Sequence, residues 1–288
     1  EVLREEGLDP ERVAGLIAGE DRYGQLVSGE LDVDRMDYLV RDAHHTGVPY
    51  GTIDHERLVR ELTFADGDLV LAEGNVQTAE SLLLARALMN PTVYTQHTAR
   101  ISKAMLRRAT ERLLDATEWT AHDVRRWDDY DLLSALRRTD ATSEFARRYD
   151  ERALFKRAVW AEYDDVPARV REFGFEEADA AERAIAERAE VRPRDVIVDV
   201  EREPSMREST SEVIVNDEVR RLEDESPLVS ALREAQRRRW RLGVYCPDDA
   251  IDRVGAAAVA ELELDAETAP VSEVKENVHA TLDEFGAE

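Results

Sequence analysis

The chain contains very little cysteine and very little lysine. Cys246 is the only cysteine among 288 residues, so neither a disulfide framework nor a cysteine zinc site can form within one chain. Lysine occurs only at Lys103, Lys156 and Lys275, and the other 36 basic residues are arginines. Lysine depletion with a large acid excess is typical of adaptation to high salt, where screening weakens self-repulsion. We therefore expect a halophilic protein, since a merely acidic one would not account for the missing lysines.

Positive charge and long apolar runs are also scarce. The chain has 39 basic and 64 acidic residues, a net charge of −25, which argues against general nucleic-acid binding because that requires a cationic surface. No apolar run approaches the roughly 20 residues that span a bilayer, and no signal peptide is visible. We expect a soluble cytoplasmic protein without a membrane partner. The chain begins EVLREEG, without methionine, so we expect a fragment or a processed chain.

Helical periodicity dominates the first 190 residues. Apolar residues recur at steps of three and four, which predicts helices over residues 11–18, 34–45, 79–114, 121–138, 144–163 and 176–190. Within 79–114, Pro91 either starts a second helix or kinks a single one.

The pattern changes after Val191. β-Branched runs predict short strands at 196–200, 211–217 and 243–247, and helices are expected at 228–242 and 251–262. The last twenty residues are acidic and are expected to form a weak helix at most. We expect a mainly α protein, with a helical domain over 1–190 and a smaller α/β lobe over 191–288 that ends in an acidic tail.

Two helix faces gather groups that can bind a ligand. Asp34, Tyr38 and Asp42 recur every four residues and therefore stack on one face, near His45. Carboxylates, a phenol and an imidazole can hold a divalent metal and a polyhydroxylated ligand.

The second face consists of Arg86, Asn90 and Tyr94, also at four-residue steps. An arginine, an amide and a phenol on one stripe can bind a phosphate and position a base or sugar. Each face has a plainer alternative. The first is then a solvated acidic helix in which Asp37 pairs with Arg41, and the second an arginine stem at the rim of a core. Spacing alone does not decide between them.

The chain contains the segment DVDRMDYLVRDAHH followed by TGV, the segment ESLLLAR and the pattern VYxxH. Together these segments closely resemble the HD-domain phosphohydrolases. The greatest similarity is to the branch of deoxynucleoside triphosphate triphosphohydrolases. The pattern D-[VA]-D-x-x-D-Y-x-x-R-D is far more specific than a lone His-Asp pair. The resemblance extends from Glu1 through the VIVDV and VYC segments, and it implies a partial HD-domain helical fold.

The resemblance implies a role for each residue of the first face. Asp34 matches the last of four metal ligands, and Arg35 matches a basic residue that contacts the triphosphate. Tyr38 and Asp42 match residues that hold the deoxyribose, and His45 is placed with them as a substrate-binding residue.

The second face is interpreted in the same way. Arg86 matches a phosphate-contacting arginine, and Tyr94 matches a tyrosine against the sugar or base. Asn90 departs from a histidine found in some relatives, which leaves its part in phosphate binding or proton transfer undefined.

The metal site that the resemblance implies is incomplete in this chain. The family uses a histidine, a His-Asp pair and the last aspartate, yet only 33 residues precede Asp34 and none is histidine. The one His-Asp pair, His122 and Asp123, comes later at an expected helix start, where the helix dipole favours aspartate. We therefore expect the C-terminal part of a longer HD protein, lacking three of four ligands and inactive by itself or nearly so.

These features predict a metal-dependent nucleotide phosphohydrolase of the HD type, with deoxynucleoside triphosphates as leading substrates. The implied cofactor is a divalent metal ion (Mg, Mn, Zn, Fe, Ni or Co), and a homo-oligomer is expected by family inference. Another phosphoester is a possible substrate. The alternative from another class is a non-catalytic helical interaction or regulatory protein that retains a nucleotide-binding face.

The sequence contains two weaker functional signals. Arg57, Arg152 and Lys156 resemble residues that contact a regulatory nucleotide in the human member of the triphosphohydrolase branch, although a helix rim packed by the lysine stem is the plainer alternative. The segment RRRWR at 237–241 has a composition that binds nucleic acid, but in so acidic a chain we favour a helix face paired with acids.

Overall fold

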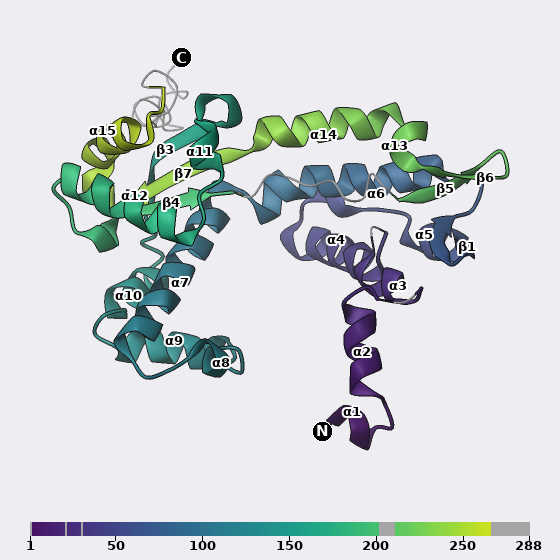
Figure 1. Cartoon of the computed structure of the whole chain (residues 1–288), viewed down its shortest axis with the longest axis horizontal. Helices are drawn as coiled ribbons and strands as arrows, with labels where there is room; N and C mark the ends of the chain where they lie inside the picture. The colour runs from purple at the N-terminus through teal and green to yellow at the C-terminus, as the bar shows by residue number, and fades with distance from the viewer. Residues whose placement is uncertain (1, 21, 30, 202–210, 266–288) are drawn as a thin grey trace, which may run out of the picture. The chain divides into compact units, whose positions relative to one another are not determined.

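The computed structural model describes residues 2–20, 22–29, 31–201 and 211–265 (Figure 1). The chain folds into two compact units, and each is built from two separate segments. The first unit comprises Glu1–Gln96 and Pro204–Arg237, and the second comprises His97–Glu203 and Arg238–Glu288. The expected boundary near residue 190 lies inside the second unit. Helices predominate over small sheets, which confirms a mainly α fold with a smaller α/β part.

The first unit combines helices with a four-stranded sheet. Its helices are α1 (Val2–Glu5), α2 (Pro10–Ile17), α3 (Gly24–Ser28), α4 (Val33–Thr46), η1 (Pro49–Gly51), α5 (His55–Glu61), α6 (Val76–Met89), η2 (Asn90–Tyr94), α13 (Leu222–Glu225) and most of α14 (Pro227–Arg239). Strands β1 (Leu62–Ala65), β2 (Asp68–Leu71), β5 (Glu212–Val215) and β6 (Glu218–Arg221) form a sheet in that order. Strand β2 pairs with β5 in parallel, so the sheet joins the two segments of the unit.

Helix α4 begins and ends where its sequence predicts. Asp32 caps the N-terminus, because its side chain accepts a hydrogen bond of 2.6 Å from the backbone N–H of Arg35. Gly47 ends the helix in the left-handed region, at φ 71°. The apolar side of α4, with Leu39 fully buried, packs with Leu82 and Met89 of α6 in one core.

The turn after α4 requires glycine for a steric reason. A Cβ atom at Gly51 would lie 2.2 Å from the carbonyl oxygen of Leu39 and 2.8 Å from the Cβ of Ala43. Helix η1 can therefore pack against the buried side of α4 only because residue 51 has no side chain.

The second unit places helices on both faces of a three-stranded sheet. Its elements are α7 (His97–Ala116), α8 (Ala121–Val124), α9 (Asp129–Arg138), α10 (Ser143–Asp150), β3 (Lys156–Glu162), η3 (Tyr163–Asp165), α11 (Ala168–Arg171), α12 (Phe175–Arg188), η4 (Pro193–Asp195), β4 (Ile197–Val200), β7 (Arg241–Cys246), η6 (Asp248–Ala250) and α15 (Ile251–Leu262). The strand order is β3-β7-β4, and both pairings are antiparallel. Val198 and Val244 face the core shared with α12 and α15, whereas Ile197 and Tyr245 face the core shared with α7, α9 and α10.

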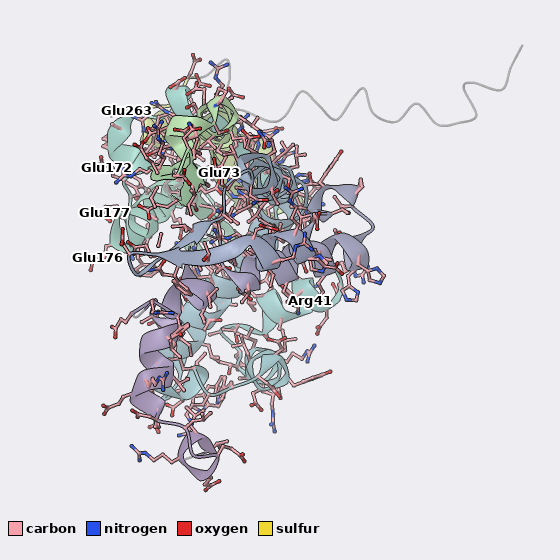
Figure 2. The ribbon with its side chains drawn as sticks, turned by 90° about the vertical axis from the view of Figure 1, so that its right-hand side faces the viewer. Arg41, Glu73, Glu172, Glu176, Glu177 and Glu263 are labelled. Atoms are coloured by element: carbon pink, nitrogen blue, oxygen red, sulfur yellow. The ribbon has the colours of Figure 1, made fainter. Side chains whose placement is uncertain are left out.

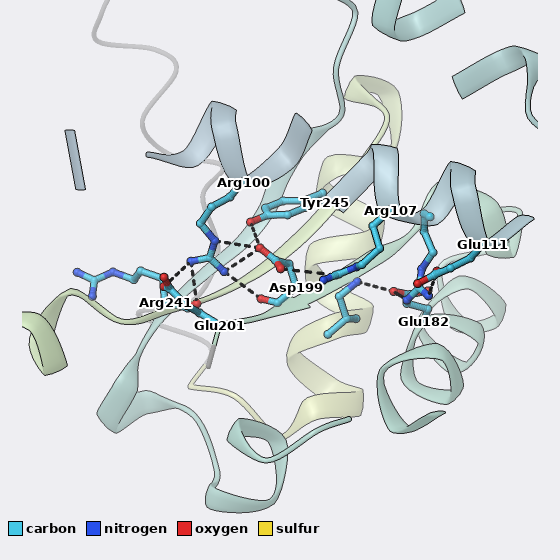
Figure 3. A network of polar contacts seen from close by, with 10 residues as sticks. Arg100, Arg107, Glu111, Glu182, Asp199, Glu201, Arg241 and Tyr245 are labelled. Carbon is cyan, nitrogen blue, oxygen red and sulfur yellow. Dashed lines mark hydrogen bonds and ion pairs between the residues drawn. The ribbon is translucent and has the colours of Figure 1, made fainter. Parts of the chain in front are cut away.

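A buried arginine connects α7 to this sheet (Figure 3). Arg100 is 7% exposed, and its Nε donates to Asp199 Oδ2 at 2.9 Å. Its Nη1 donates to Glu201 Oε2 at 3.2 Å and to the carbonyl of Arg241 at 3.0 Å. Tyr245 donates to the same Asp199 oxygen at 2.9 Å. The guanidinium is thus satisfied by groups of β4 and β7 and by the residue that follows β4, as a buried charge requires.

Two expected helices are different in the structure. The helix predicted over 144–163 is wrong beyond α10, because Lys156–Glu162 forms β3 and pairs with β7. The helix predicted over 121–138 is divided into α8 and α9, since Asp128 caps a new helix start by accepting from the N–H of Asp131 at 2.8 Å. The weak helix expected in the last twenty residues lies outside the described part of the chain.

A β-hairpin at 62–71 was absent from the sequence interpretation. Strands β1 and β2 are joined by Asp66 and Gly67, both with positive φ (52° and 101°). An Asp-Gly pair is a strong hairpin signal because a two-residue turn needs φ > 0. The pair was therefore a usable signal for this hairpin.

Candidate functional site

The structure brings the two predicted faces together within the first unit. Tyr94 Oη donates a hydrogen bond of 2.9 Å to Asp42 Oδ2, across 52 residues of sequence. The Tyr38 and Tyr94 rings meet edge to face, with centroids 5.7 Å apart and an interplanar angle of 83°. Tyr38 is also hydrogen-bonded to the Arg86 side chain. Arg86, Tyr38, Tyr94 and Asp42 therefore form one continuous set, which we call the binding face.

Tyr94 reaches α4 from a π-helical turn. The N–H of Thr95 bonds to the carbonyl of Asn90 at 2.8 Å, five residues back, over the segment Asn90–Tyr94. Pro91 is tolerated because it lies in the first turn of this segment. The four-residue spacing is α-helical from Arg86 to Asn90 and π-helical from there to Tyr94. Such turns change the direction of side chains and often occur at functional sites.

The phenol of Tyr94 is held in its protonated form. Burial first, and then its hydrogen bond with Asp42 and the charge of that carboxylate, raise the pKa of Tyr94 well above its ordinary value. The hydroxyl is therefore a stable donor that orients the Asp42 carboxylate.

Asp32 belongs to the cationic end of the binding face, although the sequence analysis did not select it. It is 6% exposed and forms an ion pair of 3.3 Å with Arg35. Burial raises the pKa of Asp32, while the backbone N–H and the guanidinium of Arg35 oppose that rise. Burial and the nearby charge of Arg35 lower the pKa of Arg86. Arg35 thus pairs with this buried carboxylate, the charge of Arg86 also acts on it, and the two guanidiniums give this end the charge to attract an anion.

Asp34 lies in the first turn of α4 and is exposed. Its oxygen donors suit a divalent cation. Among the residues that the structure describes, no group of three or more His, Cys, Asp or Glu is placed to hold a metal ion. The described part of the chain therefore does not form a complete metal site of its own.

The structure shows the contacts of His45, of Asp37 and of the His122-Asp123 pair. His45 is exposed, and its ring contacts that of His44, with centroids 5.3 Å apart. Asp37 forms an ion pair with Arg41. The alternative interpretation of this helix, as a solvated acidic helix, predicted this pair. Asp123 accepts from the backbone N–H and hydroxyl of Thr120 at 2.9 and 2.7 Å, which confirms a helix start.

The residues predicted for a regulatory nucleotide are divided between the units. Arg57 is in the first unit, where its Nε donates to Asn75 Oδ1 at 3.0 Å. Arg152 and Lys156 are exposed in the second unit, and Arg152 has a positive φ of 55°. Trp240 of the RRRWR segment is 1% exposed, so its ring is not available to stack on a base.

The family model described as HD associated region matches residues 53–273 of the chain. The chain belongs to this family. This match confirms the resemblance to HD-domain proteins at the level of the family. Membership of the triphosphohydrolase branch stays a prediction. The matched range includes Arg86, Asn90 and Tyr94 but begins after α4, so the DVDRMDY segment lies outside it.

Two relatives of this chain are considerably longer than the chain itself. An uncharacterized protein of Methanocaldococcus jannaschii is 32% identical over 234 residues, 79% of this chain and 51% of that protein. An uncharacterized protein of Bacillus subtilis is 35% identical over 106 residues, 36% of this chain and 24% of that protein. The chain thus spans about half the length of the Methanocaldococcus protein.

Two solved structures share the fold. A hypothetical protein from Aquifex aeolicus has a TM-score of 0.66 at 23% identity, over 86% of this chain and 64% of that one. A phosphohydrolase from Bacteroides thetaiotaomicron has a TM-score of 0.60 at 20% identity, over 86% and 69%. In the described part of this chain, no helix is both long and apolar enough to cross a membrane.

Proposed function

We propose that the whole protein is a metal-dependent nucleotide phosphohydrolase, with deoxynucleoside triphosphates as its leading substrates, and that this chain supplies the binding face. The observation that carries the proposal is the connected set of Arg86, Tyr38, Tyr94 and Asp42. One end of the set is cationic and the other presents a carboxylate oriented by a phenol. A nucleotide has the matching polarity, with phosphates at one end and a hydroxylated sugar in the middle.

Each side chain has a definite task in this proposal. Arg35 and Arg86 neutralise the phosphate oxygens, and the planar guanidinium can bind them through two hydrogen bonds. Asp42 accepts a hydrogen bond from a sugar hydroxyl, while Tyr94 holds that carboxylate in place. Tyr38 provides a ring surface and is itself held by Arg86. Charge that develops on the phosphates during hydrolysis then meets donors that are already oriented.

The implied metal would be bound through Asp34, together with ligands from outside the described residues. A divalent ion at such a site polarises a phosphoryl group and activates water. The fold shared with the Bacteroides phosphohydrolase supports this chemistry. The alternative is a regulatory or interaction protein that binds a nucleotide without hydrolysing it. The incomplete set of ligands among the described residues is the observation that favours this alternative.

The decisive experiment compares the product of the whole reading frame with the 288-residue chain. Both are given a panel of deoxynucleoside triphosphates, monophosphates and cyclic nucleotides with Mg, Mn, Zn, Fe, Ni or Co, and the released phosphate species are measured. We expect turnover by the whole protein only, with nucleotide binding by both. If both proteins bind a nucleotide and neither hydrolyses it, the regulatory alternative is supported. If the 288-residue chain hydrolyses a nucleotide without the rest of the protein, the proposal that its metal site is incomplete is contradicted.

Single substitutions test the binding face within the whole protein. Arg86→Gln should lower kcat/KM about 100-fold or more, because it removes a charged donor to the phosphates. Tyr94→Phe should lower it about tenfold, since Asp42 loses the donor that orients it. Arg41→Gln is the matched control on the same helix, because Arg41 is exposed and pairs with Asp37. Equal kinetics for all three variants would contradict the assignment of the face.

A further inference from the structure

The second unit contains a cavity that shares no residue with the binding face. It lies beside η3 and α11, at the point where β4 ends, and its volume is about 420 Å³. Pockets that hold small organic molecules have volumes of roughly 300–1,000 Å³. Its polar lining consists of Tyr163, Arg171, Glu172 and Glu201. We call this cavity the α11 pocket, and it has room for a ligand.

Arg171 brings a positive charge to the wall of the α11 pocket and is held in place there. Its guanidinium lies 4.0 Å from the centre of the Tyr163 ring, and its Nη1 donates to the Tyr163 carbonyl oxygen at 2.9 Å. These contacts occupy one N–H and supply no carboxylate. Among the residues that the structure describes, Arg171 forms no ion pair. The guanidinium therefore has both donors and charge left for a ligand.

Two carboxylates bring negative charge to the same pocket. Glu172 is exposed and forms no ion pair with the described residues. Glu201 is half-buried, and its Oε2 accepts from Arg100 at 3.2 Å (Figure 3), while no described residue donates to its Oε1. Burial raises the pKa of Glu201, and the charge of Arg100 opposes that rise. A second cationic group beside Glu201 would therefore favour its charged form.

The remaining wall is apolar and is tied to the core of the second unit. The apolar lining residues are Ala168, Phe173 and Val200. Phe173 and Val200 also pack against the core between the sheet, α12 and α15. The Tyr163 ring meets the Trp240 ring edge to face, with centroids 5.4 Å apart, and Trp240 Nε1 donates to the Glu201 carbonyl oxygen at 2.6 Å. The pocket is thus formed before any ligand binds.

The mixture of groups in the α11 pocket restricts its ligand. Arg171 would repel a simple cation, and Glu172 and Glu201 would repel a simple anion. A purely apolar molecule would cover these groups without satisfying their hydrogen bonds, which is costly. A molecule with one charge of each sign and an apolar body matches every part of the lining.

We propose that the α11 pocket binds a free amino acid with an apolar side chain, in its zwitterionic form. The ligand carboxylate would accept hydrogen bonds from Arg171, since the planar donors of a guanidinium match two carboxylate oxygens. The ligand ammonium group would donate to the carboxylates of Glu172 and Glu201. Its side chain would lie against Phe173 and Val200, where burial of carbon surface adds affinity.

The test is a calorimetric titration of the 288-residue chain with L-leucine and L-phenylalanine. Each amino acid is compared with its methyl ester, which lacks the carboxylate, and with its N-acetyl form, which lacks the ammonium group. We expect one molecule of amino acid to bind per chain, and each analogue to bind about tenfold more weakly or worse. The proposal is overturned if neither amino acid binds at millimolar concentration, or if both analogues bind as tightly as the parent.

Single substitutions assign the binding to this pocket. Arg171→Gln should weaken L-leucine binding by roughly tenfold to hundredfold and remove the preference for L-leucine over its methyl ester. Glu172→Gln is the second variant, in case the first does not fold, and it should reduce the preference over N-acetyl-leucine. Arg169→Gln is the matched control, because Arg169 is on the same helix, is exposed and pairs with Glu263 at 3.1 Å.

Equal affinity of Arg171→Gln and Arg169→Gln for L-leucine would also overturn the proposal. The loss of the ester preference separates a direct contact from a general disturbance of the fold, since a disturbed pocket would bind both ligands more weakly. None of these measurements involves hydrolysis or a residue of the binding face. Failure here therefore leaves the proposed function unaffected, and failure of the proposed function leaves this inference unaffected.

Discussion

At the residue scale, Asp32 contributes both to the start of α4 and to the cationic end of the proposed binding face. Its carboxylate caps α4 and forms an ion pair with Arg35. Asparagine is as good an N-cap as aspartate, so Asp32→Asn keeps the cap and removes only the charge. This separation makes the electrostatic part of its role measurable.

The raised pKa of Asp32 predicts a specific pH dependence of stability. Burial makes deprotonation less favourable in the folded chain than in the unfolded one, whose pKa is near 3.8. The contribution of this group is therefore fully present below that value and is lost as pH rises through the folded pKa. As pH rises from 3, the free energy of unfolding should therefore fall less for Asp32→Asn than for wild type. Urea unfolding at a series of pH values measures this difference. The exposed Asp37→Asn is the control, and parallel curves for wild type and Asp32→Asn would refute the prediction.

At the element scale, the contact of η1 with α4 helps to set the position of the helix that carries Tyr38 and Asp42 of the binding face. Gly51 permits this contact because any Cβ there would overlap the backbone of Leu39. Leu39 is fully buried, so the helix cannot move away without opening the core. Tyr38 and Asp42 on α4 depend on the same packing for their approach to Tyr94.

Gly51→Ala is expected to destabilise the first unit. Overpacking at such a site costs about 1–3 kcal/mol, and it should also weaken nucleotide binding by displacing α4. Gly15→Ala in α2 is the matched control, because its nearest neighbour is the flexible end of Glu20 and alanine favours a helix by up to about 1 kcal/mol. Thermal unfolding and nucleotide titration measure the two effects. A Gly51→Ala variant as stable as the control would contradict the steric argument.

At the scale of the whole molecule, charge dominates the solution behaviour. Acidic side chains such as Glu73, Glu172, Glu176, Glu177 and Glu263 are exposed (Figure 2). A net charge of −25 makes the compact state repel itself, and salt screens that repulsion. The expected adaptation to high salt follows from this balance and stays a prediction.

The free energy of unfolding should rise as KCl is increased from low to molar concentration. Glu172, Glu176 and Glu187 are exposed and have no ion pair with the described residues. Changing all three to glutamine should therefore raise stability at low salt and reduce its dependence on salt. Urea unfolding at several KCl concentrations measures both. A salt dependence equal to that of wild type would indicate that these charges do not contribute.

Local signals in the sequence predicted several elements correctly. Helix α4 was expected at 34–45 and spans Val33–Thr46, since Asp32 and Gly47 mark its two ends. The strand expected at 196–200 is β4, and the helix expected at 251–262 is α15. The helix expected at 228–242 is α14, which ends at Arg239, because Arg241 and Leu242 already belong to β7. In each case the residues that define the element are adjacent in sequence, so a short window contains the information.

Contacts between distant residues were beyond that kind of prediction. Strand β3 was interpreted as helix because its two alanines and Arg157 favour a helix locally, whereas its pairing with β7, distant in the sequence, favours a strand. The parallel pairing of Val70 with Glu212 likewise joins segments with no common local pattern.

The sequence by itself determined the helical class, the acidic surface and the residue types on the two faces, because composition and spacing are local properties. Only the tertiary structure decided that Tyr94 bonds to Asp42, that Arg86 bonds to Tyr38, and that Asp32 is buried in an ion pair with Arg35. Those contacts depend on how α4 packs against α6 and the π turn, and such packing follows from side-chain shape and burial over the whole first unit.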